Sequence, residues 1–377
     1  MQSDLLKCKY VVSLMILFQI GSSVLLGANP EIEQDSWLAL LFSMAGVIPI
    51  ILIYARIAEL YPDKCIYGIC IDIFGKVIGR VMITLFTFYS FHLTAIVLRN
   101  FVEFLQITNL TETPHFPIMI AMMLVCIYLL RSGIQTIGKW GMAMAPVVLL
   151  FIFVTTITSL NHLNFENILP ILDHSPKEFL SASYSLYTFP FAETVLFLGA
   201  FPLLNKGENP YRVYIYAILI GGISLFIITL RNILILGPQF GKAQYFASYN
   251  AARIIELGEF FTRIEATISI NYILAGITKI TVCLLSATKG IAKMFSADYN
   301  KLIIPCGLIV LALCPLTYEN VIDMFAALHY YPYYVLPFQT ILPIIIWIGA
   351  EIKTPRKANP NESPGNSPPN AQAPASS

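Results

Sequence analysis

The sequence predicts an all-α integral membrane protein with ten transmembrane helices. Hydrophobic residues make up 57% of the 377-residue chain and charged residues only 12%, whereas about 25% of a soluble domain is charged. The mean hydropathy is +0.71. Ten apolar runs approach the roughly 20 residues that a helix needs to cross a bilayer. Basic residues gather in alternate connections between these runs, as they do in loops that face the cytoplasm.

The predicted spans follow one another along most of the chain. Lys7 and Lys9 precede the first apolar run as in a signal peptide, but Gly27-Ala28-Asn29-Pro30 is a poor cleavage site, so we interpret this run as a retained span. Ile66–Phe74 is apolar but too short to cross, and it predicts an interfacial helix. The fourth, ninth and tenth runs are short. The ten predicted spans are Tyr10–Gly27, Trp37–Ile57, Val77–Leu98, Phe116–Leu130, Gly141–Leu160, Phe179–Phe201, Val213–Leu236, Ala266–Ala287, Leu302–Leu316 and Tyr333–Ile348.

Charge predicts the orientation of these spans. With the N-terminus in the cytoplasm, sixteen of the 23 Lys and Arg residues lie on the inner side, while the outer connections carry mainly Asp and Glu, with Lys177, Lys242 and Arg253 as exceptions. Both termini are therefore predicted to be cytoplasmic. The membrane domain is predicted to end near residue 352, and the Pro-, Asn- and Ser-rich residues 353–377 are predicted to form a disordered cytoplasmic tail.

Composition also excludes several classes of function. The net charge is +1 and the basic residues are scattered, so the chain has no predicted nucleic-acid surface. Its seven cysteines include no Cys-x-x-Cys pair, which argues against a disulfide framework or a zinc site. No His-Glu-x-x-His, Gly-x-Ser-x-Gly or paired-carboxylate motif is present. We therefore expect no catalytic residue, no metal and no cofactor, and a membrane-embedded enzyme is the least favoured interpretation.

Two predicted spans at corresponding positions are interrupted. Ten spans divide into five and five, and because five is odd, the second half (about 179–350) enters the membrane from the side opposite to the first (about 8–160). The first and sixth spans then correspond. Pro190 interrupts the sixth, and Gly, Ser and Asn-Pro residues between Gly21 and Pro30 loosen the first. Matching interruptions indicate a transporter's binding site, because freed backbone groups bind small zwitterions. The alternative is that the Gly and Ser residues of the first span only allow close packing.

Several motifs then carry a resemblance to a known family. They are Gly21-Ser22-Ser23-Val24-Leu25-Leu26, Tyr61-Pro62, Ile73-Phe74-Gly75-Lys76-Val77-Ile78-Gly79, Phe189-Pro190-Phe191-Ala192-Glu193, Leu230-Arg231-Asn232-Ile233-Leu234-Ile235-Leu236-Gly237-Pro238 and Arg263-Ile264-Glu265. From Tyr10 to about Glu351, the chain resembles the B subunit of bacterial spore germinant receptors, the spore germination protein family within the amino acid–polyamine–organocation transporter superfamily. It departs from the family pattern at Ala192, where glycine is common, and at Asn29-Pro30.

This resemblance implies a leucine-transporter-like fold of two inverted five-helix repeats with broken helices 1 and 6. It also implies detection of a small-molecule germinant, often an amino acid, at the inner membrane of the dormant spore. The partners that it implies are a germinant-receptor A subunit and a lipoprotein C subunit, with the lipid bilayer around them. A proton- or cation-coupled amino-acid permease shares every feature except these partners, and a ligand-gated ion pathway formed with the A subunit is a third possibility, because fold alone does not fix function.

Four ionisable residues lie within or at the ends of the apolar runs after the first. Arg99 and Arg231 are near predicted outer ends, where a long side chain snorkels to the interface. Glu193 and Lys279 lie 14 and 13 residues after the starts of the sixth and eighth spans, which run in the same direction, so the two side chains are predicted at similar depths. We expect them to be able to form an ion pair, which is either permanently structural or displaced by a ligand.

Polar and aromatic side chains on the third, sixth and eighth spans complete the predicted site. His92 on the third span is interpreted as a hydrogen-bonded core residue, with proton transfer as the alternative. The predicted ligand-binding residues are Gly21, Ser22, Ser23, Tyr89, Tyr187, Thr188, Phe189, Phe191, Glu193, Asn271 and Lys279.

Overall fold

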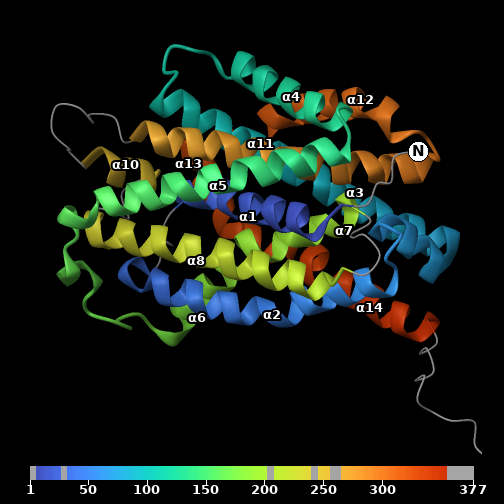
Figure 1. Ribbon diagram of the computed structural model, residues 1–377, viewed down its shortest axis with the longest axis horizontal. Helices are drawn as coiled ribbons and strands as arrows, with labels where there is room; N and C mark the ends of the chain where they lie inside the picture. The colour runs from blue at the N-terminus through green and yellow to red at the C-terminus, as the bar shows by residue number, and fades with distance from the viewer. Residues whose placement is uncertain (1–5, 27–31, 202–207, 239–244, 255–264, 355–377) are drawn as a thin grey trace, which may run out of the picture.

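The computed structural model is an elongated bundle of helices, most of which run along its long axis (Figure 1). It describes residues 6–26, 32–201, 208–238, 245–254 and 265–354, and these ranges contain no β-strand. Most of the predicted tail therefore lies outside the described residues. The α-helices are α1 (Cys8–Leu26), α2 (Ser36–Leu60), α3 (Ile66–Thr108), α4 (His115–Arg131), α5 (Ile134–Thr158), α6 (Pro176–Leu186), α7 (Leu196–Ala200), α8 (Pro210–Leu236), α10 (Ala247–Ile254), α11 (Glu265–Phe295), α12 (Tyr299–Leu313), α13 (Val321–Leu336) and α14 (Leu342–Lys353).

Short tighter or wider turns join some of these helices. Two π-helical turns, Tyr187–Phe191 and Pro337–Ile341, lie between α6 and α7 and between α13 and α14. Short 3-10 turns occupy Glu33–Asp35, Leu160–His162, Phe165–Ile168, Ala192–Val195 and Cys314–Leu316.

Helices dominate because a bilayer core offers no water to bond backbone N–H and C=O groups, which a helix satisfies internally. Among the described residues, seven helices are long and apolar enough to cross a membrane: Glu33–Leu60, Ile66–Thr108, Ile134–Thr158, Pro210–Leu236, Glu265–Phe295, Tyr299–Leu316 and Val321–Lys353. Cys8–Gly21 and His115–Arg131 are shorter apolar helices. Length and composition thus identify a multi-pass membrane protein, but they do not confirm the predicted count of ten.

Several helices extend beyond the predicted spans, including those of the third and tenth. The third was predicted to end at Leu98, but α3 continues to Thr108, where Arg99 and Glu103 are buried and pair with each other. The tenth was predicted to begin at Tyr333, whereas the helix begins at Val321 and continues through the π-helical turn. A π-helical turn accommodates a proline that an α-helix tolerates poorly.

The short helix predicted at Ile66–Phe74 is present and is set off from the rest of α3 by Gly75. Gly75 has φ +74° and ψ −173°, a conformation that glycine adopts readily and other residues rarely do. The chain therefore changes direction there before α3 enters the bundle.

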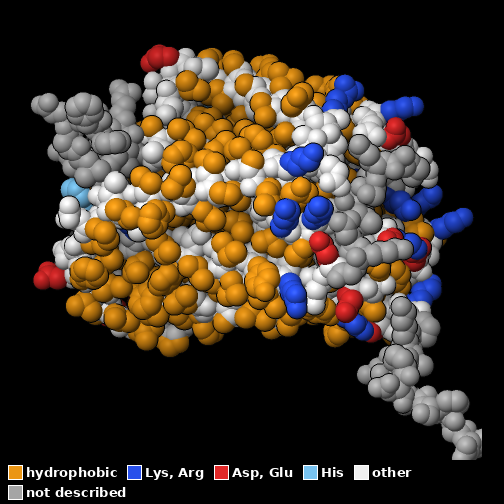
Figure 2. Space-filling view, in the orientation of Figure 1, with side chains coloured by type: hydrophobic (Ala, Val, Ile, Leu, Met, Phe, Trp, Pro, Cys, Tyr) orange, Lys and Arg blue, Asp and Glu red, His pale blue; other side chains and the backbone are white. Residues whose placement is uncertain are grey.

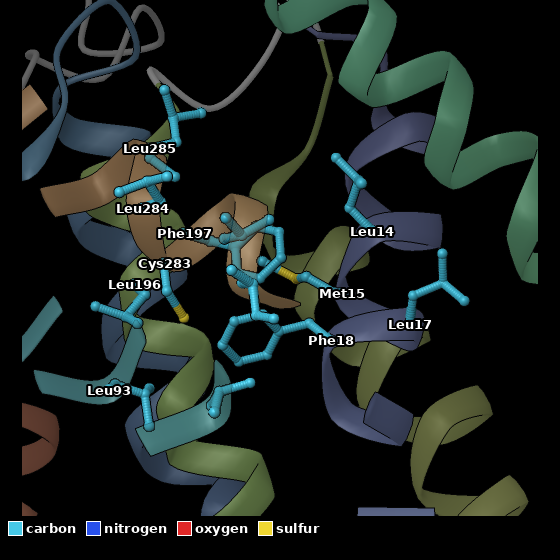
Figure 3. Close-up of a cluster of buried hydrophobic side chains, with 14 of the residues drawn as sticks. Leu14, Met15, Leu17, Phe18, Leu93, Leu196, Phe197, Cys283, Leu284 and Leu285 are labelled. Carbon is cyan, nitrogen blue, oxygen red and sulfur yellow. The ribbon is translucent and has the colours of Figure 1, made fainter. Parts of the chain in front are cut away.

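The centre of the bundle is formed by α1, α3, α7 and α11. α11 packs against all three of the others, and α1 also packs against α5 and α8. Figure 3 shows side chains from these helices meeting in one buried cluster. The residues labelled there are Leu14, Met15, Leu17 and Phe18 of α1, Leu93 of α3, Leu196 and Phe197 of α7, and Cys283, Leu284 and Leu285 of α11.

Hydrophobic side chains cover most of the face seen in Figure 2, as expected for a surface in contact with lipid. On this face, Lys and Arg side chains gather at the right-hand end, where α14 ends, and few appear at the opposite end near α10. The visible surface thus has the uneven distribution of Lys and Arg on which the predicted orientation rests.

Arg99 and Arg231 do not snorkel as predicted, because both are buried, with 4% and 3% exposure. Arg99 pairs with Glu103 at 2.5 Å and donates to the Glu319 carbonyl at 3.1 Å. Arg231 donates to the Thr155 hydroxyl at 3.0 Å and to the neighbouring Asn232 side chain. Both guanidinium groups therefore bind acceptors inside the protein and do not extend to the membrane interface.

Candidate functional site

The sixth span is discontinuous, as predicted. α6 begins with a capping box, in which the Ser175 hydroxyl accepts from the Glu178 backbone N–H and the Glu178 carboxylate accepts from Ser175. These bonds hold the pKa of Glu178 below its ordinary value. Pro190 then ends the helix: Phe189 leaves helical geometry at φ −131° and ψ 112°, because a residue before proline is disfavoured in the α region.

The described part of the first span is not interrupted. α1 is helical without a break from Cys8 to Leu26, and Gly27–Pro30 lie outside the described residues. Gly21 faces α11 at an ordinary van der Waals distance, so close packing at this position does not require a glycine. A Cβ atom placed there would lie 3.4 Å from both the Ala275 carbonyl oxygen and Lys279 Cδ. A glycine lowers helix stability by only about 1 kcal/mol. The backbone hydrogen bonds of a helix in an apolar environment stabilise it by more than this, so the helix continues through Gly21.

Glu193 and Lys279 form the predicted ion pair. Lys279 Nζ donates to Glu193 Oε2 at 2.6 Å, and both side chains are fully buried. Glu193 lies in the 3-10 turn Ala192–Val195 just after the break, and Lys279 lies near the middle of α11. The break therefore brings a carboxylate to the helix that carries the buried ammonium group.

Aromatic rings enclose the ammonium group of Lys279. Its Nζ lies 5.0 Å from the ring centroid of Phe18 on α1 and 4.6 Å from that of Phe189 at the break. Such cation–π contacts contribute about 2 kcal/mol or more when they are desolvated. The ammonium thus contacts α1, α11 and the interruption of the sixth span together.

The second oxygen of Glu193 connects the pair to the tenth span. Tyr331 on α13 donates its hydroxyl to Glu193 Oε1. The Tyr331 hydroxyl lies 3.5 Å from that of Tyr89 on α3, which accepts from Gln339 Nε2 at 2.7 Å. Tyr54 on α2 in turn donates to the Gln339 carbonyl. The chain of polar contacts therefore runs from α11 through the break to α13, α3 and α2.

Two of the predicted residues contribute buried polar atoms without hydrogen-bond partners. Among the residues that the structure describes, the Oγ atom of Ser23 has no partner, and neither do the Oδ1 and Nδ2 atoms of the fully buried Asn271. Ser23 lies on α1 and Asn271 on α11, two helices that pack together. Because a buried amide is normally hydrogen-bonded, these atoms are suited to a ligand or a water molecule.

The remaining predicted residues are bonded within the protein or only pack. The Tyr187 hydroxyl bonds the Thr340 hydroxyl at 3.0 Å, and Thr188 donates to the Ser185 carbonyl at 2.8 Å. Phe191 is fully buried in the hydrophobic core. The side chain of Ser22 is outside the described set.

His92 is partly buried and hydrogen-bonded, which agrees with its interpretation as a structural residue. Its Nδ1 lies 3.3 Å from the Tyr334 hydroxyl, and its ring stacks on Phe88. It also lines a cavity of about 220 Å³, together with Tyr318, Tyr330 and Tyr331. Its role in proton transfer stays a prediction.

Sequence reasoning missed Tyr331, Gln339 and Phe18. Tyr331 lies in the aromatic run His329–Tyr334, most of which precedes the predicted start of the tenth span. Gln339 was a detectable signal, since it is an uncharged polar residue within an apolar run and is fully buried. Nothing in the sequence distinguished Phe18 from other apolar residues of the first span.

Comparison with solved structures identifies the fold. The chain superposes on a structure of Mhp1, a nucleobase-cation-symport-1 family transporter, in a closed conformation with bromovinylhydantoin bound. The TM-score is 0.67 and the sequence identity is 11%, and the superposition covers 91% of this chain and 80% of that one. For MhsT in complex with L-phenylalanine, the TM-score is 0.63, the identity is 14%, and the coverage is 89% and 87%. The fold is therefore leucine-transporter-like.

Comparison of sequences identifies the family. The chain is 24% identical over 363 residues to spore germination protein KB of Bacillus subtilis (strain 168), which covers 95% of this chain and 97% of that protein. It is 22% identical over 294 residues to spore germination protein YndE of the same organism, with 75% and 79% covered. The profile of the family described as "Spore germination protein" matches residues 5–321. The chain therefore belongs to the spore germination protein family, as a non-enzymatic B-type membrane subunit of a germinant receptor.

Proposed function

We propose that this subunit binds a small polar germinant, an amino acid or a similar nutrient, between the first span and the break in the sixth. The observation that carries the proposal is the Glu193–Lys279 pair, which is fully buried at the break. Such a pair contributes little net stability, because desolvation offsets its attraction. A ligand offers a reason for it: a zwitterion brings a carboxylate for Lys279 and an ammonium group for Glu193.

The proposed signal is a change in helix arrangement. In the ligand-free state, Lys279 is held by Glu193, and a ligand's charged groups replace one or both partners. A ligand shifts a conformational equilibrium only as far as it binds the two states unequally. Replacement of the pair provides that difference, and the unbonded atoms of Ser23 and Asn271 provide further ligand contacts.

The proposed topology has ten spans in two inverted repeats, over residues about 8–160 and 179–350, with both termini in the cytoplasm. Seven of these spans are the helices identified by length. The other three are the short α1, the short α4 and the broken sixth span. We place the protein in the spore inner membrane, beside a germinant-receptor A subunit and a lipoprotein C subunit that read its conformation.

The second candidate is a proton- or cation-coupled amino-acid permease. The observation that favours it is the fold shared with Mhp1, which is itself a transporter. Accumulation of a labelled amino acid by the purified chain alone in liposomes would support the permease. Loss of germination on deletion, without any such accumulation, would support the receptor.

The most informative measurement for the ligand is the thermal stability of the purified chain against a panel of amino acids, sugars and nucleosides. A ligand that binds only the folded state at 100 times its Kd stabilises that state by about 2.7 kcal/mol. No change in melting temperature with any member of the panel would contradict the proposal for these three ligand classes.

Charge reversal separates a functional pair from a structural one. In Glu193→Lys with Lys279→Glu, the attraction between the two positions is retained but the ligand's groups meet the wrong charges. We expect folding to recover relative to either single change while the germinant response stays lost. Recovery of both would identify the pair as purely structural.

A further inference from the structure

A second cavity lies at the end of the bundle opposite to α14. It has a volume of about 560 Å³ and lies between the end of α3, the helix α10 and the beginning of α11. Figure 1 shows α10 at the left-hand end of the bundle and α14 at the right. The lining residues that matter here are Asn109, Phe246, Tyr249, Asn250, Arg253 and Glu265.

The cavity carries one full charge of each sign. Arg253 lies at the end of α10 and Glu265 at the beginning of α11. Neither side chain has an ion-pair partner within the described ranges of the chain. A guanidinium group binds a carboxylate through two parallel hydrogen bonds, and a carboxylate binds an ammonium group. The two side chains therefore carry charges that complement those of a zwitterion.

Part of the cavity wall is aromatic. Phe246 and Tyr249 line the cavity, and behind them their rings contact Phe104 of α3 at centroid distances of 5.2 and 5.7 Å. Phe104 contacts Tyr272 of α11 at 4.8 Å, and Tyr272 stacks on Phe101. Phe246 is only 4% exposed, so an apolar ligand side chain would lie mainly against the partly exposed ring of Tyr249.

This aromatic layer separates the cavity from the buried pair. Glu265 and Lys279 are 14 residues apart on α11, which corresponds to about 21 Å along the helix. Tyr272 lies halfway between them, and Lys279 itself is fully buried. A ligand arriving from this end therefore meets the cavity and the aromatic layer before it reaches Lys279.

We infer that this cavity is a capture site for a zwitterionic amino acid with an apolar side chain. The carboxylate binds Arg253, the ammonium group binds Glu265, and the side chain lies mainly against Tyr249. Occupation of the cavity precedes entry to the buried site. The inference rests on the proposed function for the direction from which the ligand comes, but binding at the cavity does not require the Glu193–Lys279 pair.

The test measures binding of tritiated L-phenylalanine to the purified full chain by equilibrium dialysis, with two analogues that each keep one charge, 3-phenylpropionate and phenethylamine. Binding is measured in the unaltered chain and in Glu193→Gln with Lys279→Met, which removes both charges of the buried site. In both, Arg253→Gln is expected to weaken the binding of L-phenylalanine and 3-phenylpropionate at the cavity at least about tenfold and to leave phenethylamine unchanged, since a charge-assisted hydrogen bond is lost.

Glu265→Gln is expected to give the opposite selectivity, with phenethylamine weakened and 3-phenylpropionate unchanged. Lys177→Gln and Glu112→Gln change exposed charges that also lie on the predicted outer side and serve as matched controls. Thermal unfolding of each variant is recorded first to show that it folds. If the double variant does not fold, the Arg253→Gln and Glu265→Gln changes are tested in the unaltered chain alone.

Two results would overturn the inference. One is that Arg253→Gln and Glu265→Gln behave like their controls. The other is that binding seen in the unaltered chain disappears in a folded Glu193→Gln, Lys279→Met protein, which would assign all binding to the buried site and leave the proposed function intact. Conversely, retained binding in the double variant supports the capture site even if charge reversal shows the buried pair to be purely structural.

Discussion

Removing one member of the Glu193–Lys279 pair is expected to destabilise the protein strongly, and removing both is not. With Nζ and Oε2 2.6 Å apart, the charge centres lie within about 4 Å, where their attraction is about 4 kcal/mol at an effective dielectric constant of about 20. A single change also leaves the remaining charge buried without a partner. We therefore expect Lys279→Met alone to lower the free energy of unfolding by about 3–5 kcal/mol.

The double variant Glu193→Gln with Lys279→Met leaves neither charge of this pair in the interior and keeps an oxygen that accepts from Tyr331. Replacement of a buried ion pair by uncharged side chains of similar volume is often neutral or stabilising, so its stability should lie within about 1 kcal/mol of the unaltered chain.

The assay is equilibrium unfolding in mixed micelles of the unaltered chain, the two single variants and the double variant, analysed as a double-mutant cycle. We expect a coupling energy of at least about 2 kcal/mol, well beyond the 0.5 kcal/mol or so within which independent sites add. The matched control is the exposed Lys64, which pairs with Asp72 and whose pKa is raised by that hydrogen bond. The coupling energy of the Lys64–Asp72 pair should be about 1 kcal/mol or less. Additive effects at Glu193 and Lys279 would refute the reasoning.

Three further predictions concern other polar contacts. Thr155→Val removes an acceptor from the buried Arg231 guanidinium and should cost about 1–3 kcal/mol in equilibrium unfolding, whereas an unchanged stability would mean that water replaces the hydroxyl. Asp35 is buried and accepts from two backbone N–H groups of the connection before α6. Asp35→Ala should therefore lower the free energy of unfolding by about 2–4 kcal/mol and speed proteolysis of that connection. Equal rates of cleavage in the variant and the unaltered chain would contradict this role. Ser175→Ala should cost about 1 kcal/mol and let the pKa of Glu178 rise toward its ordinary value in an NMR titration. Because that pKa is depressed in the folded state, the stability it contributes is lost as pH falls through it, and the variant should lose less stability in acid.

The sequence predicted the features that depend on local chemistry. Pro190 has no backbone N–H, so the interruption of the sixth span followed from residue type alone. The depth of Glu193 and Lys279 followed from the constant rise of a helix, which places residues at equal distances from the same membrane face at similar levels. These two inferences together located the ion pair.

Features that depend on the arrangement of several helices were missed or wrong. Tyr331 reaches Glu193 only because α13 packs beside the break, and no spacing in one sequence reports that contact. Arg99 was assigned to the interface because its partner Glu103 lay beyond the predicted end of the span. Gly21 was interpreted as loosening a helix, whereas α1 stays helical through it to Leu26.

The buried pair also bears on how often the protein changes state without a ligand. In any arrangement that separates α11 from the turn carrying Glu193, two charges lie unpaired in an apolar interior, at a cost of about 3–5 kcal/mol. At equilibrium this corresponds to roughly one molecule in a hundred to one in several thousand. Under the proposed function, this contact between two side chains would set a low background of spontaneous activation, and a weakened pair should be read out as germination in the absence of nutrient.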